Sequence, residues 1–234
     1  MYVSTNNSSK KGDFFMKHLT ILAAASLALL AAFVCPAQDA ASAKIDPKAA
    51  EVALPAPARI GGMPLMQALA ERKTIRDYKP AELDAATLSE ILYAANGVNR
   101  PDGKRTIPTA MNTQDLEVYA TLPNAVYHYD AKANKLLKIE DGDFRAEFIT
   151  RKDLANNAAC ILVYAADTTK NRTPETKFSA IHVGEASQDV YLYCASKGLG
   201  TVSLGMYDEK AVRKVFKLED KMNVILAQAV GVPK

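Results

Sequence analysis

Ala125-Val126-Tyr127-His128-Tyr129-Asp130, followed after four residues by Lys135-Leu136-Leu137-Lys138-Ile139, is the stretch that decides the fold. Two β-rich segments around a short turn at residues 131–134 predict a β-hairpin. The preceding segment 115–120 alternates apolar and polar residues and predicts another strand. Successive antiparallel strands exclude a doubly wound parallel sheet, because parallel strands need long crossover connections. The sequence therefore predicts an α+β fold with a mainly antiparallel central sheet.

Further elements are predicted on both sides of the hairpin. The continuous apolar run 158–165 predicts a central strand, and segments 201–204 and 224–230 predict two more strands. The helical spacing of apolar residues predicts helices over residues 63–69, 84–95, 178–197 and 208–216. Apolar residues are so numerous in 178–197 that we expect this segment to be a buried central helix.

Length and composition fit one globular domain that acts on a small molecule. The chain has 234 residues, and its 49% hydrophobic content is enough for a packed core. The net charge of +3 is the balance of 29 basic and 26 acidic residues, with no long basic run. We therefore expect no nucleic-acid partner.

The N-terminus has the pattern of an export signal. Met16-Lys17-His18 leads into an apolar stretch over residues 19–34, and small residues follow at Cys35 and Ala37. This pattern predicts a signal peptide over residues 1–37, cleaved after Ala37, and hence a periplasmic protein with no other membrane association. A retained membrane anchor and lipidation at Cys35 are the alternatives. The polar prefix before Met16 suggests that translation starts at Met16.

After the signal, residues 38–59 are rich in Ala and Pro and predict an N-terminal arm or tether. The folded domain is expected to span residues 60–234. Within it, Cys160 and Cys194 lie in apolar segments and are expected to be buried free thiols, although export leaves a disulfide between them open. No metal site is expected, because no Cys or His pair has ligand spacing.

Two polar segments have side chains suited to a phosphorylated heterocycle. In the first, Glu71 to Tyr78, the cations Arg72, Lys73 and Arg76 and the hydroxyl of Thr74 can bind phosphate oxygens, or they can simply form a solvated helix end. In the second, Pro108 to Gln114, two carboxamides can pair with the edge of a flavin ring, or an Asn side chain can close an ordinary turn.

A third segment, Gly198-Leu199-Gly200-Thr201-Val202-Ser203-Leu204-Gly205, is rich in glycine. It departs from the G-x-G-x-x-G loop of Rossmann folds, because Ser203 replaces the third glycine and a helix precedes the segment. It also departs from the G-x-S-x-G nucleophile elbow, since Thr201 occupies a glycine position. Neither a dinucleotide-binding fold nor a serine hydrolase is predicted.

With these three segments in this order, the chain resembles the FMN-dependent nitroreductase family. Residues 71–78 are similar to its R-R-S-x-R-x-[FY] motif, 108–114 to P-[ST]-[SA]-x-N-x-Q, and 198–205 to G-L-G-x-x-x-x-G. The hairpin from Val126 onward resembles the G-x-Y-x-Y-D-x-x-x-x-x-L pattern of the SagB-type dehydrogenase branch. The resemblance runs from about Leu65 to Pro233 and implies a three-layer α/β/α fold and a homodimer.

The resemblance also implies FMN bound at the dimer interface by residues of both subunits. By this resemblance, the FMN phosphate and ribityl chain would be bound by Arg72, Lys73, Thr74 and Arg76. The isoalloxazine ring would lie along Ser203, Leu204 and Gly205. The flavin would also be contacted from the partner subunit, by Pro108, Thr109, Asn112 and Gln114. Family members usually continue past Gly231-Val232-Pro233 to further basic residues on the phosphate, where this chain has only Lys234.

The implied activity is an oxidoreductase that passes hydride through flavin N5 to a small acceptor such as a nitroaromatic or a quinone. No catalytic acid or base is expected, because the flavin performs the chemistry. NAD(P)H is one possible donor, although export separates the protein from it. The alternatives are a SagB-like azoline dehydrogenase and an exported flavin-binding protein without turnover. Tyr78, Tyr127 and His128 either reach a substrate or pack in the core.

Overall fold

The computed structural model describes residues 44–171 and 176–234. These residues belong to one compact unit that begins at Ala40. The predicted signal peptide, its cleavage after Ala37, the start at Met16 and the lipidation alternative at Cys35 all lie outside the described residues.

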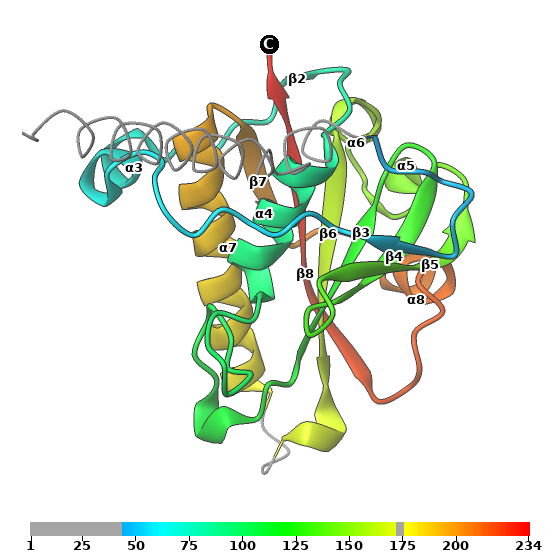
Figure 1. Cartoon of the computed structure of the whole chain (residues 1–234). Coiled ribbons are helices and arrows are strands. Elements are labelled where there is room, and N and C mark those ends of the chain that lie inside the picture. Colours follow the sequence, from blue (N-terminus) through cyan, green and yellow to red (C-terminus); the bar gives the residue numbers. More distant parts are fainter. Residues whose placement is uncertain (1–43, 172–175) are drawn as a thin grey trace, which may run out of the picture. The chain divides into compact units, whose positions relative to one another are not determined.

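The described residues form an eight-stranded sheet in which every pairing is antiparallel (Figure 1). The strand order is β1-β5-β4-β3-β6-β8-β2, and β7 also pairs with β8. The strands are β1 (Glu51–Ala53), β2 (Tyr78–Lys79), β3 (Leu116–Thr121), β4 (Ala125–Asp130), β5 (Lys135–Asp141), β6 (Cys160–Asp167), β7 (Gly200–Leu204) and β8 (Met222–Pro233). The predicted antiparallel sheet is confirmed.

The hairpin and the central strand form where the sequence predicts them. Strands β4 and β5 pair around a turn in which Asp130 Oδ1 accepts hydrogen bonds from the backbone N–H groups of Lys132 and Ala133 at 3.0 and 3.1 Å. Every residue of β6 is buried. This strand lies between β3 and β8, which explains why its sequence is a continuous apolar run rather than an alternating one.

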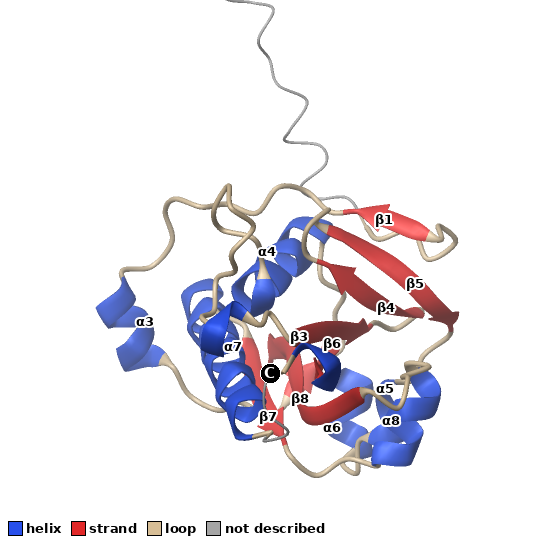
Figure 2. Cartoon of the chain, turned by 90° about the horizontal axis from the view of Figure 1, so that it is seen from below, coloured by secondary structure: helices blue, strands red, loops and turns tan. Residues whose placement is uncertain are grey.

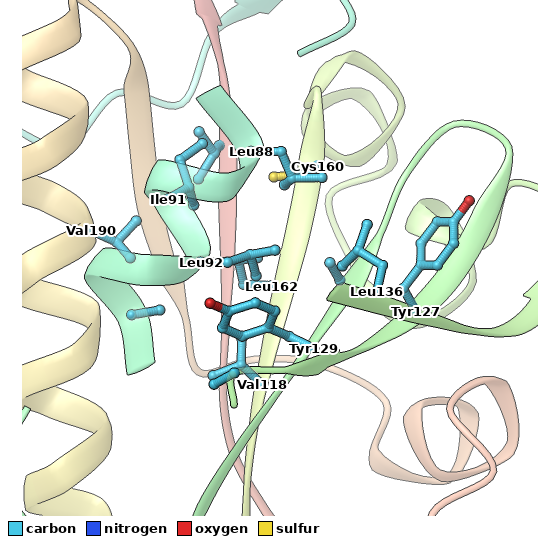
Figure 3. Packing of buried hydrophobic residues seen from close by; sticks show 14 of the residues in the cluster. Leu88, Ile91, Leu92, Val118, Tyr127, Tyr129, Leu136, Cys160, Leu162 and Val190 are labelled. Atoms are coloured by element: carbon cyan, nitrogen blue, oxygen red, sulfur yellow. The ribbon is translucent and has the colours of Figure 1, made fainter. Parts of the chain in front are cut away.

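Helices cover both faces of the sheet, and three layers result (Figure 2). One face carries α4 (Ala85–Asn96) and α7 (Lys177–Lys197), and the other carries α5 (Arg145–Phe148), α6 (Lys152–Asn157) and α8 (Glu209–Val215). Leu88, Ile91 and Leu92 of α4 point toward Leu162 and its neighbours on β6 (Figure 3). The predicted α+β architecture with a central antiparallel sheet is confirmed.

Helix α7 is buried on one face only. Val183, Ala186, Val190 and Cys194 face the sheet, whereas Ile181 is 53% exposed. The predicted burial of this helix therefore holds for the face toward the sheet, whereas the face that carries Ile181 is exposed in a single chain. Helix α3 (Leu65–Glu71) also has an exposed apolar surface, since all of its apolar side chains except Ala68 are exposed.

The segment before residue 60 is part of the folded domain. Residues 51–53 form β1 and pair with β5, and Ile45 and Leu54 are buried. The expected boundary at residue 60 is too late, because an edge strand is held by backbone hydrogen bonds and needs little apolar periodicity. The short elements β2, α5 and α6 are also absent from the sequence prediction.

Candidate functional site

The basic segment after α3 is extended and bound to β7. Helix α3 ends at Glu71, and further along the segment the Ile75 N–H donates to the Thr201 carbonyl at 3.1 Å. The hydroxyl of Tyr78 donates to the Ile75 carbonyl at 2.7 Å. A Cβ on Gly200 would lie only 2.8 Å from Ile75 Cγ2, so this close approach requires a glycine. The first and third polar segments are therefore in direct contact.

Tyr191 of α7 joins these two segments. Its hydroxyl accepts a hydrogen bond from the Ser203 backbone N–H at 3.0 Å and lies 3.2 Å from Thr74 Oγ1. The guanidinium of Arg72 lies over its ring, 5.3 Å from the centroid. Tyr191 is not among the predicted site residues, because a tyrosine within a helix rich in apolar residues has no sequence pattern that separates it from core packing.

A buried polar network fixes β7 behind this contact. Ser203 Oγ lies 2.8 Å from Ser187 Oγ on α7. Gln228 Nε2 donates to Thr201 Oγ1 at 3.0 Å and to the Ser187 carbonyl at 3.2 Å, and its Oε1 accepts from Tyr164 at 2.6 Å. Burial raises the pKa of the Tyr164 hydroxyl well above its usual range. The Ser203 side chain is therefore engaged with Ser187 in this network rather than directed at a ligand.

Open space begins where β7 ends. Leu204 is half-buried and Gly205 is exposed. A Cβ built on Gly205 would meet no atom within 4 Å. A planar group can therefore approach the backbone of these two residues closely.

The predicted cations line two hollows near the start of β7, whereas Leu204 and Gly205 are at its end. Lys73 lines a hollow of about 450 Å³ together with Tyr191, Gly198 and Leu199. Arg76 and Lys234 line a smaller hollow of about 250 Å³. In the part of the chain that the structure describes, none of Arg72, Lys73, Arg76 and Lys234 forms a salt bridge. Their positive charge is therefore available to an anion.

The 108–114 loop lies elsewhere, beside the N-terminal part of α7. The Ala110 N–H donates to His182 Nε2 at 2.8 Å. Because His182 and Tyr191 are nine positions apart on α7, the loop is about 14 Å along the helix axis from the Tyr191 contact. Figure 1 shows α3 near one end of α7 and the green segment that precedes β3 near the other. Among the described residues, no hydrogen bond joins Pro108, Thr109, Asn112 or Gln114 to residues 203–205.

The sequence model of the nitroreductase family matches residues 69–232, a range that contains all three polar segments. The chain belongs to the nitroreductase family. A curated protein of Methanocaldococcus jannaschii that bears the nitroreductase name is 30% identical over 169 residues, which cover 67% of this chain and 85% of that protein. The chain is accordingly an oxidoreductase of this family.

Solved structures agree with this assignment. A structure from Ralstonia eutropha JMP134 that bears the nitroreductase name has a TM-score of 0.74 at 32% identity, and the match covers 82% of this chain and 93% of that one. A structure from Desulfovibrio desulfuricans, named as a nitroreductase in complex with FMN, has a TM-score of 0.55 at 19% identity and covers 74% and 88%. The second likeness concerns the fold alone.

Of the remaining candidates in this nitroreductase-family chain, Tyr78 packs beneath the basic segment, whereas Tyr127 and His128 lie on β4, away from it. Tyr78 and Tyr127 are buried, and His128 on β4 lies 3.0 Å from the Glu117 carboxylate. Cys160 and Cys194 are buried free thiols, and burial raises the pKa of Cys160 to about 12. Among the described residues no group of His, Cys, Asp and Glu is arranged to hold a metal ion. Each helix within these same residues is too short or too polar to span a lipid bilayer.

Proposed function

We propose that this chain is an FMN-dependent oxidoreductase that binds the flavin where α7, β7 and the 72–76 segment meet. One observation carries the proposal: the Tyr191 hydroxyl joins Thr74, in the basic segment, to Ser203, at the end of β7. A phosphate-binding group and a surface for a flat ring are thereby held in one fixed arrangement.

The residues present fit FMN. The dianionic phosphate needs cations and hydroxyl donors, which Arg72, Lys73, Arg76, Lys234 and Thr74 supply without competing salt bridges among the described residues. The ring needs a flat approach to the backbone, which the empty space around Gly205 allows. The proposed contacts along the isoalloxazine are Ser203, Leu204 and Gly205.

We propose a homodimer in which the flavin-ring loop of one subunit contacts the flavin of the other, as the family resemblance implies. The partner subunit would supply Pro108, Thr109, Asn112 and Gln114. Two uncovered apolar surfaces support this assembly, namely α3 with Leu65 and Met66 and the outer face of α7 with Ile181. A second copy that buries them gains the free energy of removing apolar area from water.

FMN supplies the redox chemistry when it is bound, since its N5 takes up a hydride and gives it to an acceptor. The chain's own residues bind and orient it: cations hold the phosphate, Tyr191 holds the two flavin segments together, and the partner's loop excludes water from the ring. We propose a nitroaromatic or a quinone as the acceptor and NAD(P)H as one donor, with no side chain acting as an obligatory acid or base.

The narrower assignment to the SagB-type branch, with azoline oxidation as the alternative reaction, is supported by the hairpin pattern alone. Export with cleavage after Ala37 and a periplasmic location are likewise part of our proposal. N-terminal sequencing of the protein recovered from the periplasm tests the cleavage site, and an intact N-terminus in the cytoplasm would contradict it.

The decisive experiment is to express the full sequence in a bacterial host, purify the protein without added flavin and record its visible spectrum before and after FMN is added. We expect oxidised-flavin absorption, bleaching by a reductant without air, and its return with a nitroaromatic or a quinone. FMN that is retained but turns no acceptor over would favour the flavin-binding protein without turnover. A protein that retains no FMN would overturn the proposal.

A further inference from the structure

A second group of polar side chains lies between the N-terminal part of α7 and the segment that precedes β3, away from Tyr191. Asp115, which is 0% exposed, accepts a hydrogen bond from Ser179 Oγ at 2.6 Å and from Thr113 Oγ1 at 3.1 Å. His182 Nδ1 lies 2.8 Å from the same carboxylate, and His182 is 3% exposed. None of these residues has a part in the proposed function.

The hydrogen bonds fix the tautomer of His182. A backbone N–H can only donate, so His182 Nε2, 2.8 Å from the Ala110 nitrogen, must be the acceptor and carries no proton. The ring proton of neutral His182 is therefore on Nδ1, where it is donated to Asp115. Ala110, His182 and Asp115 form one chain of hydrogen bonds that runs from the flavin-ring loop to a buried carboxylate.

The loop held by this chain has an unusual backbone. Met111, Asn112 and Gln114 have φ values of 53°, 54° and 45°, in the left-handed region that residues other than glycine seldom adopt. Such a conformation persists only where surrounding contacts fix it. The Ala110 anchor stands directly before these residues, and a bond from the Gln114 N–H to Thr109 Oγ1 at 3.1 Å closes the loop.

We propose that His182 and Asp115 are positioning residues that set the shape of the 108–114 loop for contact with the FMN ring of the partner subunit. This inference rests on the proposed function. Helix α7 then has two tasks: Tyr191 organises the flavin segments of its own subunit, and His182 presents the loop to the partner's flavin. Neither His182 nor Asp115 touches FMN.

The test compares two substitutions of His182 in the flavin-loaded dimer. His182→Asn keeps an amide N–H for Asp115 and loses the acceptor for Ala110. His182→Gln places a side-chain oxygen near the position of Nε2 and keeps that acceptor. We expect His182→Asn to weaken FMN and riboflavin equally, by about tenfold, as for one lost buried hydrogen bond. His182→Gln should recover most of this loss.

The visible spectrum and the midpoint potential of bound FMN report on loop contact rather than on folding. Both should change in His182→Asn and return toward the parent in His182→Gln. His128→Gln is the matched control, since His128 also pairs with a carboxylate but lies on β4, outside the site. It should leave spectrum, potential and affinity unchanged.

Ser179→Ala keeps the test informative if His182→Asn does not fold, because it removes only one donor to Asp115. A shifted potential in folded Ser179→Ala supports the inference. Parent-like spectrum, potential and affinity in a folded His182→Asn dimer, or in Ser179→Ala where His182→Asn does not fold, would overturn it and leave the FMN proposal intact. A parent protein that binds no FMN would instead refute the proposed function.

Discussion

The hydroxyl of Tyr191 accepts the backbone N–H of Ser203 at 3.0 Å. Since its lone pair faces Ser203, its own proton is free for Thr74 Oγ1, 3.2 Å away. One side chain of α7 thus fixes, together with the Ile75–Thr201 backbone bond, how the basic segment lies beside β7. A flavin that spans the two depends on that arrangement.

Replacing Tyr191 with Phe tests this dependence. The ring and its contact with Arg72 remain, whereas the bonds to Thr74 and Ser203 are lost. We expect FMN affinity to fall by about five- to tenfold and the free energy of unfolding to fall by about 1 kcal/mol, the usual values for a lost hydrogen bond. Fluorescence titration of FMN and urea unfolding measure the two effects.

Tyr193→Phe is the control for this substitution. The Tyr193 hydroxyl donates to Glu90 at 2.8 Å from the same helix, toward α4 rather than β7. We expect a similar loss of stability with FMN affinity unchanged. Equal losses of affinity in both variants would mean that Tyr191 acts through general destabilisation of α7.

Arg76→Gln should weaken FMN by about tenfold or more and leave riboflavin affinity within about twofold, because a charge-assisted bond to phosphate is worth about 1.5–3 kcal/mol and riboflavin has no phosphate. The loss should shrink at high salt. Lys210→Gln removes the same charge from an exposed position on α8 and should change neither affinity. A matching loss of riboflavin would place Arg76 at the ring instead.

Much of the fold follows from the sequence, because its elements carry complete local patterns. The β4–β5 hairpin has its turn residues, and the Asp84 side chain caps α4 by accepting the Thr87 N–H at 2.6 Å. Strand β1 and the short helices α5 and α6 could not be predicted, because long-range contacts stabilise them. The outer face of α7 was misjudged because counting apolar residues does not show which partner covers them.

The sequence predicts the segments that form the site but not the α7 side chains that hold these segments in place. Arg72, Thr74 and Ser203 stand in recognisable motifs, so their sequence neighbours identify them. Tyr191 and His182 lie within α7 and act across distances of many residues, so no local pattern marks them. The position of the 108–114 loop beside His182 is also a property of the fold, since the sequence does not show which part of α7 the loop contacts.

Two glycines of the third segment should respond oppositely to alanine. At Gly200 the new Cβ would lie 2.8 Å from Ile75 Cγ2, so we expect a loss of about 1–3 kcal/mol in the free energy of unfolding. At Gly205 the Cβ meets open space, so stability should stay within about 0.5 kcal/mol. FMN affinity should fall in Gly205→Ala, because the methyl group occupies the proposed flavin surface. Unchanged affinity there would remove residue 205 from the site.

The carboxyl of Asp189 on α7 gives the chain a predictable dependence on pH. Burial, together with the nearby Glu185 carboxylate, raises the pKa of Asp189 from 3.8 to about 6. Between these values the unfolded chain has released the proton that the folded chain still holds. The contribution of Asp189 to stability is therefore largest below pH 3.8, falls as pH rises toward 6, and stays reduced above it.

Asp189→Asn removes this titration. At pH 7.5 the variant should be more stable than the parent by about 1–2 kcal/mol, a value reduced from the full shift because Asp189 is partly exposed. At about pH 3 the two should nearly coincide, since Asp189 is then mostly protonated in both the folded and the unfolded chain. Urea midpoints at the two pH values measure this, with Asp220→Asn on an exposed loop as the control. A gain of the same size at both pH values would show that Asn packs better, and that ionisation of Asp189 has no part in it.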